Sequence, residues 1–345
     1  MPRDPRILIV RTDRIGDVVL TTPAIHALRR SYPKAFLSIL VSPLTRDLVH
    51  RNPDLDEVLL DDRGGEHQGL SGFWKLVRHI QQKKFDRAIV FHTKRRTNLL
   101  CFLAGIPQRV GYANDKHGFL LTERIPDERS RGLKHEAEYC LEVLKVLGVT
   151  DHELKCFVPL HEECEAWVDH WMAGNRISPS EKLIAIHPGA SDQTKEWPAE
   201  RFHQLAEALL ADYPCRIVLV GGRDSTAAQK IMTGAKDNVM DLTGKTTVGQ
   251  LISLLKRCRL LISNDSGPVH VASAVGTPVV SIFTRNQPGI NPERWRPLGE
   301  NSRIVVTPFD GDVSFAKGEV RDARYLNAIS VETVWQAVDA VLKVC

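Results

Sequence analysis

Short β-branched runs alternate with amphipathic stretches along almost the whole chain. Arg6–Val10 (RILIV) opens one such series, and Leu183–His187 (LIAIH) opens a second series with the same pattern. Strands that are apolar on both faces belong to parallel sheets covered by helices on both sides. The sequence therefore predicts an α/β protein with two doubly wound, Rossmann-like halves.

The domain boundary is predicted in a polar stretch, GNRISPSE, at residues 174–181. A length of 345 residues fits two domains. We assign residues 1–175 to an N-terminal domain, 176–330 to a C-terminal domain and 331–345 to a closing helix. Ligands of such sheets bind beyond the carboxyl ends of strands, so the loops that follow strands are the candidate sites.

Composition excludes several classes of protein. The chain has 46 Lys and Arg against 42 Asp and Glu, and a formal charge of +4 is too small to indicate a nucleic-acid partner. Residues 1–180 contain 27 Lys and Arg against 24 Asp and Glu, and this small positive excess slightly favours an anionic partner. No apolar run approaches the ~18–20 residues of a membrane span. Seven scattered cysteines without a CxxC pair predict reduced thiols and a cytoplasmic location.

The loop after the first strand, residues 11–17, contains one glycine and is therefore not a dinucleotide fingerprint. Gly16 permits a tight turn, which places Asp17 at or near the start of a helix over Val18–Arg30. Asp17 then either caps that helix or presents a carboxylate that accepts a proton. A helix N-terminus lowers the pKa of a carboxyl group, so we expect Asp17 to be ionised at pH 7.

The loop after Leu183–His187 combines the small residues Gly189, Ala190 and Ser191 with Lys195, just before a helix. Small residues let backbone N–H groups approach an anion, and a lysine adds a positive charge. The loop is therefore either a phosphate site or an exposed loop with a solvated lysine.

A third loop, residues 264–270, joins a buried strand to a helix of small residues. Its turn Ser266-Gly267-Pro268 leads into a helix N-terminus, which favours anions. Asp265 binds either sugar hydroxyls or the backbone of its own loop. His270 either donates to a phosphate or packs in the core.

Two other strand ends carry charge. Asp224 follows the strand Arg216–Gly221 and either binds a ribose or caps a helix. Lys94, Arg95 and Arg96 follow a strand that ends at His92. They form either a solvated helix start or a contact with an anionic substrate.

No metal site is predicted. Asp54 and Asp56 resemble a carboxylate pair, but they lie in a turn before an edge strand and have no metal-ligating partner nearby in the sequence.

Together these loops resemble the glycosyltransferase family that contains the bacterial ADP-heptose:lipopolysaccharide heptosyltransferases. The resemblance is carried by Ile7–Leu20, by His187–Ala190 with Lys195–Pro198, and by Leu242–Thr246 followed by Ser263–Phe283. It implies a GT-B fold, in which two Rossmann-like domains face a central cleft. It also implies inversion at the anomeric carbon, no metal and no cofactor beyond the nucleotide-sugar substrate, ADP-heptose.

The resemblance also implies roles for the residues. Asp17 matches the general base, and Asp13 does not occupy the matching position. Lys195 matches a lysine that contacts the donor phosphates, together with the turn Asp265, Ser266, Gly267 and His270; Asp224 falls roughly at an acidic ribose contact. The acceptor would be an anionic glycolipid of the lipid A core type, with Lys94–Arg96 and peripheral contact with the inner membrane assisting its capture.

Alternatives remain open. Residues 284–289 (TRNQPG) depart from the Gly-Pro-Thr type of turn common among relatives, which leaves room for another nucleotide-sugar. A non-catalytic nucleotide-sugar binding protein on the same fold is a second alternative.

Overall fold

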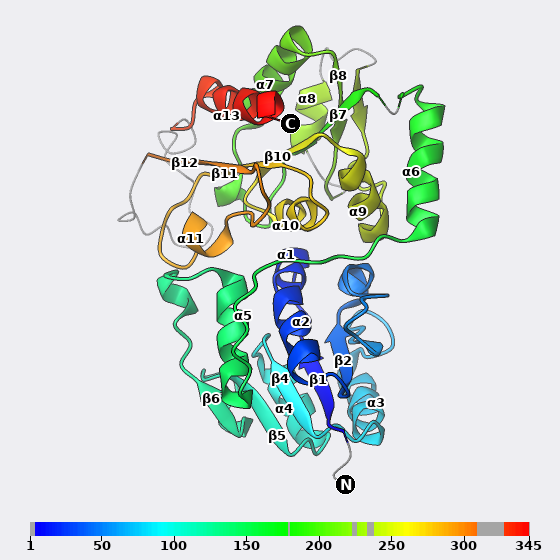
Figure 1. The fold of residues 1–345 in the computed structure, drawn as a ribbon, viewed down its shortest axis with the longest axis vertical. Coiled ribbons are helices and arrows are strands. Elements are labelled where there is room, and N and C mark those ends of the chain that lie inside the picture. The colour runs from blue at the N-terminus through cyan, green and yellow to red at the C-terminus, as the bar shows by residue number, and fades with distance from the viewer. Residues whose placement is uncertain (1–3, 179, 223–225, 233–237, 309–327, 345) are drawn as a thin grey trace. The chain divides into compact units, whose positions relative to one another are not determined.

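The computed structural model of the chain describes residues 4–178, 180–222, 226–232, 238–308 and 328–344 (Figure 1). The chain forms two compact units. The first contains residues 1–130 and 134–159, and the second contains residues 131–133 and 160–345. Among the described residues, no helix has both the length and the apolar character needed to cross a membrane.

The first unit is built on a six-stranded parallel sheet with the order β3-β2-β1-β4-β5-β6. β1 lies at its centre, with Ile7 paired with Leu37 of β2 on one side and with Arg87 of β4 on the other. Its buried residues face both helical layers, as predicted. The strands are β1 (Arg6–Val10), β2 (Phe36–Val41), β3 (Glu57–Leu60), β4 (Arg87–Val90), β5 (Gln108–Tyr112) and β6 (Glu123–Ile125).

Helices cover both faces of this sheet. α2 contacts α5 on one face, and α3 contacts α4 on the other (Figure 1). The α3–α4 layer buries Phe73, Leu76 and Leu100 against strand residues such as Leu8 and Val90. The elements are α1 (Ile15–Val19), α2 (Thr22–Ser31), α3 (Gly69–Gln82), α4 (Arg95–Leu103) and α5 (Glu136–Leu144), with 3₁₀ turns η1 (Pro43–Leu48), η2 (Gly118–Leu120), η3 (Arg129–Arg131) and η4 (Lys145–Leu147).

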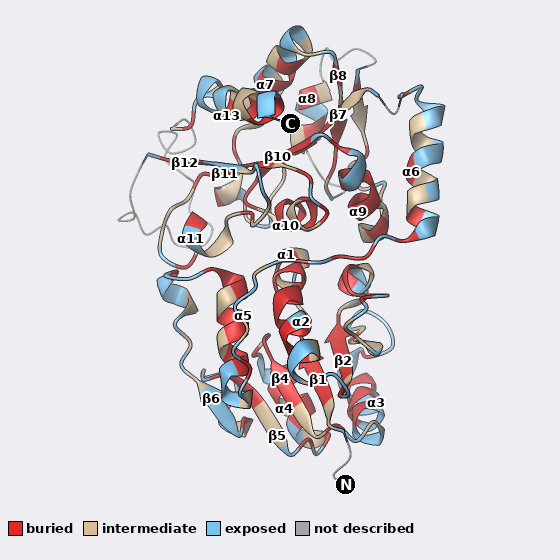
Figure 2. Ribbon diagram, viewed as in Figure 1, coloured by how far each residue is buried: buried red, intermediate tan, exposed pale blue. Residues whose placement is uncertain are grey.

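The second unit repeats this architecture, with the parallel order β12-β11-β10-β7-β8-β9. In both units the buried residues concentrate on the strands and on the helix faces that cover them (Figure 2). The strands are β7 (Lys182–His187), β8 (Cys215–Leu219), β9 (Val239–Asp241), β10 (Leu260–Asn264), β11 (Val279–Phe283) and β12 (Arg303–Val306). The helices are α6 (Glu162–Gly174), η5 (Gln193–Lys195), α7 (Ala199–Asp212), α8 (Thr226–Met232), α9 (Val248–Arg257), α10 (Gly267–Ala274), α11 (Pro292–Trp295) and α13 (Val331–Val344).

The predicted single helix over Val18–Arg30 is wrong in one respect. The chain forms two helices, α1 and α2, with a break at Leu20 and Thr21. Pro23 lies in the first turn of α2, where its missing N–H is tolerated. A continuous helix would instead place the proline ring against the carbonyl of Val19.

Other differences concern the edges of the sheets and the join. The short edge strands β6 and β12 were not predicted from the sequence. The helix α6 packs on α9, so contacts group it with the second unit and divide the chain between residues 159 and 160. The assignment of acceptor and donor roles to residues 1–175 and 176–330 stays a prediction.

Each sheet has one point where the chain reverses its direction of growth. The first sheet extends from β1 to β3 and then resumes beside β1 at β4, and the second resumes beside β7 at β10. Ligands of open parallel sheets bind outside the carboxyl ends of strands at such switch points. The candidate loops after β1, β7 and β10, and the cations after β4, all lie at these two points.

Candidate functional site

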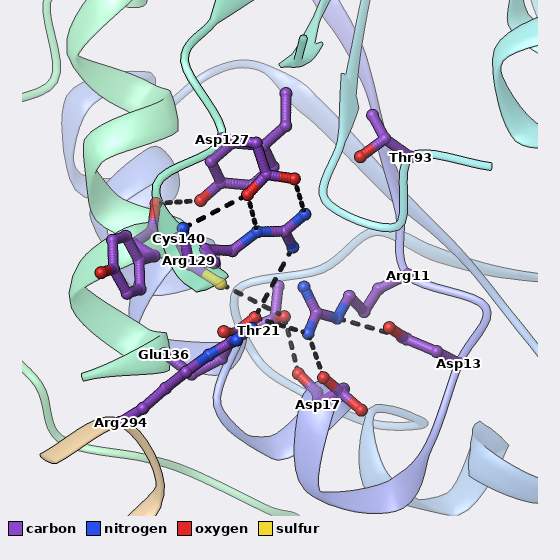
Figure 3. Close-up of polar contacts among 12 residues, drawn as sticks. Arg11, Asp13, Asp17, Thr21, Thr93, Asp127, Arg129, Glu136, Cys140 and Arg294 are labelled. Carbon is purple, nitrogen blue, oxygen red and sulfur yellow. Dashed lines mark hydrogen bonds and ion pairs between the residues drawn. The ribbon is translucent and has the colours of Figure 1, made fainter. Parts of the chain in front are cut away.

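A buried arginine organises the carboxyl edge of the first sheet (Figure 3). The Arg11 side chain follows β1 directly and is 1% exposed. Its Nη2 lies 2.5 Å from Oδ1 of Asp17 and 3.0 Å from Oε1 of Glu136, and its Nε lies 3.0 Å from Oδ1 of Asp13. One guanidinium thus holds three carboxylates that come from the β1 loop, α1 and α5.

The fold places Asp17 in the first turn of α1, whose N-cap is Arg14. Glu136 occupies the first turn of α5, so two helix N-termini present carboxylates to the same guanidinium. Asp17 is therefore not the capping residue, which was one of its two predicted roles. Its side chain is 18% exposed, whereas that of Glu136 is 1% exposed.

The expectation that the pKa of Asp17 is lowered is wrong. Burial raises the pKa of Asp17, the negative charges of Asp13 and Glu136 act in the same direction, and Arg11 opposes them. Burial is the largest cause, and it outweighs the favourable helix terminus. A carboxylate with a raised pKa is a stronger proton acceptor than an exposed aspartate.

A second polar cluster lies beside this one and contains Asp61, which is 2% exposed. Asp61 accepts hydrogen bonds from Nε and Nη2 of Arg96, at 3.1 and 2.8 Å, and from Nε of Arg63, at 2.8 Å. Although burial opposes it, these bonds lower the pKa of Asp61. Nη2 of Arg63 also donates to Oγ1 of Thr12 at 3.0 Å. The same Oγ1 lies 3.0 Å from Nδ1 of His92. Burial, followed by Arg11, lowers the pKa of His92 to about 3, so this imidazole is neutral at pH 7.

The predicted run of acceptor-binding cations divides into different environments. Arg96 is bound to Asp61 and lies 4.8 Å from the Phe73 ring centroid. Arg95 is exposed at the first residue of α4, and Lys94 is the N-cap. Burial, followed by the nearby Lys116, lowers the pKa of Lys94. Lys94 and Lys116 together place a local positive charge at the carboxyl end of β4.

At the switch point of the second sheet, Lys195 and Asp265 form an ion pair through Nζ and Oδ2. Both were predicted to bind the donor, and the structure brings them together across 70 residues of sequence. Lys195 ends η5, whose first turn is capped by Asp192. Burial raises the pKa of Asp265, while Lys195 lowers it. Asp265 thus fixes the position of the Lys195 ammonium.

Asn264 ties the two loops together. Its Nδ2 donates to the carbonyl of Pro188 at 2.6 Å, and its Oδ1 accepts from the N–H of Trp197 at 2.9 Å. The loop itself is closed by Glu196, which accepts from the N–H of Ala190 at 3.1 Å. Gly189 and Ala190 are half-buried and Ser191 is exposed, so this loop offers backbone to solvent at the edge of the sheet.

The turn before α10 adjoins a buried histidine. Ser266 is the N-cap, Gly267 and Pro268 open the helix, and His270 is 3% exposed with its ring 6.3 Å from that of Trp295. His187 Nδ1 lies 3.1 Å from Ser266 Oγ and 3.3 Å from Ser263 Oγ. Burial lowers the pKa of His187 to about 4, so it is neutral and orients Ser266 without adding charge.

No role in these sites was predicted for Arg11, Glu136, Arg63 or His187. One signal was present, since Arg11 is a charge directly after an apolar strand. Another candidate, Asp224, lies outside the described residues.

The turn at residues 284–289 contains Arg285, which donates to Oδ2 of Asp192 at 3.2 Å and to Oγ1 of Thr194 at 2.6 Å. This loop therefore braces the loop that carries Lys195.

In the described ranges, no three His, Cys, Asp or Glu side chains form a group able to hold a metal ion. The carboxylates considered above have other partners. Asp54 lies 2.9 Å from His26 Nδ1, and Asp56 lies 2.7 Å from Arg29 Nη2.

The sequence pattern of glycosyltransferase family 9 (heptosyltransferase) matches residues 73–321, which is well over half of the chain. The chain belongs to glycosyltransferase family 9. It is therefore a glycosyltransferase, and the predicted family is confirmed.

Individual relatives agree with this assignment. The chain is 25% identical to lipopolysaccharide heptosyltransferase 2 of Escherichia coli (strain K12) over 348 residues, 98% of each chain. It superimposes on the crystal structure of a family 9 glycosyltransferase from Veillonella parvula DSM 2008 with a TM-score of 0.87, 28% identity and coverage of 100% and 99%. The E. coli ADP-heptose lipopolysaccharide heptosyltransferase II gives a TM-score of 0.78 at 22% identity, with 98% of each chain covered. The predicted α/β, GT-B class of fold is confirmed.

Proposed function

We propose that this glycosyltransferase transfers a heptosyl residue from ADP-heptose to the inner core of lipopolysaccharide, with inversion and without a metal ion. The family is described as heptosyltransferases, and the E. coli relative is named for ADP-heptose and lipopolysaccharide. The observation that carries the proposal is the arrangement around Asp17. Within the described part of the chain, Arg11 binds Oδ1, and no protein donor is recorded on Oδ2.

In the proposed reaction, Asp17 acts as the general base. Its Oδ2 accepts the proton of an acceptor hydroxyl while the hydroxyl oxygen forms a bond to the anomeric carbon. The bond from that carbon to the diphosphate breaks, and ADP leaves with the electron pair. Attack on the face opposite to the leaving group inverts the anomeric centre, through an oxocarbenium-like transition state.

In the second unit, Lys195 and the turn before α10 stabilise the departing diphosphate. The ammonium offers three donors and is already bound to Asp265, so its position is fixed before the donor arrives. The N-terminus of α10 adds backbone N–H groups behind Ser266. A ribose contact by Asp224 and a phosphate contact by His270 remain parts of the same proposal.

Replacing Lys195 with Ala is expected to lower kcat/KM by about 10²–10³-fold, since the leaving diphosphate loses a positioned cation. ADP-heptose affinity should fall as well, and titration calorimetry measures it. Lys343→Ala is the matched control, because this lysine is 69% exposed, pairs with Asp339 at 2.7 Å and lies in none of the motifs named above. An unchanged donor affinity and rate in Lys195→Ala would reject the phosphate role.

The pH dependence follows from the carboxylates around Arg11. Only ionised Asp17 accepts a proton, so activity rises with pH through its pKa, which lies above that of an exposed aspartate. Glu136→Gln removes a negative charge that raises this pKa and keeps an oxygen for Arg11, so the acid limb of kcat/KM should move to lower pH. Glu142→Gln, on the same helix, should leave the limb in place. An identical limb in wild type and Glu136→Gln would contradict the assignment.

The acceptor is proposed to be an anionic, lipid A core type glycolipid that the enzyme meets at the cytoplasmic face of the inner membrane. Supporting observations are the neighbouring Lys94 and Lys116, and the exposed Arg95. Arg96 contributes through Asp61, which fixes its guanidinium.

Another nucleotide-sugar is the second candidate, favoured by Arg285 in the divergent turn beside the Lys195 loop. Purified protein should be given ADP-heptose and a panel of other nucleotide-sugars, with Kdo-bearing and heptosylated lipid A core acceptors. We expect that, among the nucleotide-sugars of the panel, only ADP-heptose releases its nucleotide. EDTA should leave the rate of this release unchanged. Consumption of another donor supports the alternative, metal dependence contradicts the metal-free mechanism, and no turnover at all supports a binding protein.

A further inference from the structure

One face of the first unit is rich in cations and exposed apolar side chains. It consists of α3, α4 and η2, which contact one another in that order. The three elements contain no Asp or Glu. We call this surface, formed by α3, α4 and η2, the α3–α4 face.

Large apolar side chains are exposed on every element of the α3–α4 face. Leu70 and Trp74 of α3 are 81% and 48% exposed, Phe102 of α4 is 46% exposed, and Phe119 of η2 is 72% exposed. The opposite sides of α3 and α4 are already committed to the core beneath them, as Phe73 and Leu100 show. These exposed side chains are therefore not needed to hold the helices on the sheet.

The charge of the same region is strongly asymmetric. Residues 61–86 and 91–120, which contain the face and its connecting loops, hold ten Lys and Arg against five Asp and Glu, a formal charge of +5. The whole chain carries +4, so the remaining residues are net negative. Of the acidic residues, Glu66 pairs with Lys75 at 2.6 Å. Arg78, Lys84 and Arg95 are exposed.

This combination points to one partner. Aromatic and leucine side chains among lysines and arginines are typical of helices that lie in the interface of an anionic bilayer. A second copy of the chain is disfavoured, because two such faces would bring like charges together. We infer that the α3–α4 face docks on the surface of an anionic lipid bilayer.

The position of the face agrees with the chemistry. α3 and α4 each begin at the carboxyl edge of the first sheet, so Leu70 and Arg95 lie at the same edge as the Arg11–Asp17 cluster. Docking would hold that edge close to lipid headgroups, where a lipid-linked acceptor presents its sugars. This orientation rests on the proposed function, whereas bilayer binding itself does not require it.

The test is co-sedimentation of the full chain with vesicles, without donor or acceptor. Binding is expected to vesicles of phosphatidylglycerol and phosphatidylethanolamine, to weaken in high salt, and to be far weaker with phosphatidylcholine alone. Lys75→Glu/Arg78→Glu should weaken binding at least about tenfold, since each cation near an anionic surface contributes roughly a factor of five. Leu70→Ser/Trp74→Ser should weaken it as well.

Matched controls lie elsewhere on the first unit. Lys34→Glu/Lys155→Glu makes the same charge change at exposed positions, and Phe157→Ser removes another exposed aromatic residue, 44% exposed. Circular dichroism checks that all variants are folded. The inference is overturned if anionic vesicles do not bind the wild type, if the α3 variants bind as well as the controls, or if these variants instead abolish self-association. Vesicle binding without heptosyl transfer would contradict only the proposed function.

Discussion

Replacing Asp17 with Asn is expected to lower kcat for heptosyl transfer by about 10²–10⁴-fold, the usual contribution of a general base. The amide retains the shape of the carboxylate but does not accept a proton at neutral pH. Donor binding should survive, because Lys195 and Asp265 lie in the other unit. Nucleotide release measures kcat, and titration with ADP-heptose measures donor affinity.

Asp13→Asn provides the matched control for this substitution. Asp13 is 18% exposed, like Asp17, and binds the same guanidinium through Nε at 3.0 Å. Both variants therefore remove one negative charge from one cluster, and only the Asp17 variant removes the proposed base. If Asp13→Asn loses the activity and Asp17→Asn keeps it, the general base is Asp13 and the assignment of Asp17 is wrong.

Replacing Arg11 with Met is expected to give the largest loss of stability. The substitution leaves three carboxylates, two of them partly buried and one 1% exposed, without their shared cation. Removing one partner of a buried ion pair lowers the free energy of unfolding by about 3–5 kcal/mol. Urea denaturation of both proteins at neutral pH measures this difference.

The loss in the free energy of unfolding caused by Arg11→Met should become smaller as the pH falls. Burial already raises the pKa values of Asp13 and Asp17 in the folded state, and loss of the guanidinium raises them further, so the folded variant binds more protons than its unfolded chain. Acidification through those pKa values then stabilises the variant relative to neutral pH. Arg30→Met is the control, since Arg30 is 58% exposed and pairs with Asp151 at 3.1 Å. A loss no larger than that of Arg30→Met would show that the cluster does not need its cation.

The fold was predictable where local sequence decides it. Apolar runs such as Arg6–Val10 and Leu183–His187 become central strands because both of their faces are buried. The edge strand β6 (ERI) was missed because an edge strand of three residues buries little and has no apolar pattern. The break between α1 and α2 depends on Pro23, a local signal that the helical pattern obscured.

The sequence was enough to predict which loops form the candidate site, but not which residues pair with one another there. Strand order places the loops after β1, β7 and β10 at switch points, which the alternation of elements already suggested. Pairings across the chain carry no such signal, since Arg11 and Glu136 are separated by 125 residues. The raised pKa of Asp17 could not be foreseen for the same reason. It results from burial among residues that only the tertiary fold assembles.

The formal charge acquires a clearer meaning from the structure. A value of +4 over 345 residues carries little information, yet +5 falls on two segments around the α3–α4 face. Another cation, Lys195, is held in place by its ion pair with Asp265. The positive charge thus belongs to specific surfaces rather than to the protein as a whole.

Product analysis tests the central proposal most directly. The purified chain is incubated with ADP-heptose and a defined truncated lipid A core, and the product is analysed by mass spectrometry and by NMR of the new anomeric centre. The account predicts an acceptor heavier by one heptosyl residue, linked with the anomeric configuration opposite to that of the donor. A core acceptor that remains unmodified while another nucleotide-sugar is consumed, or a linkage that retains the donor configuration, would contradict it.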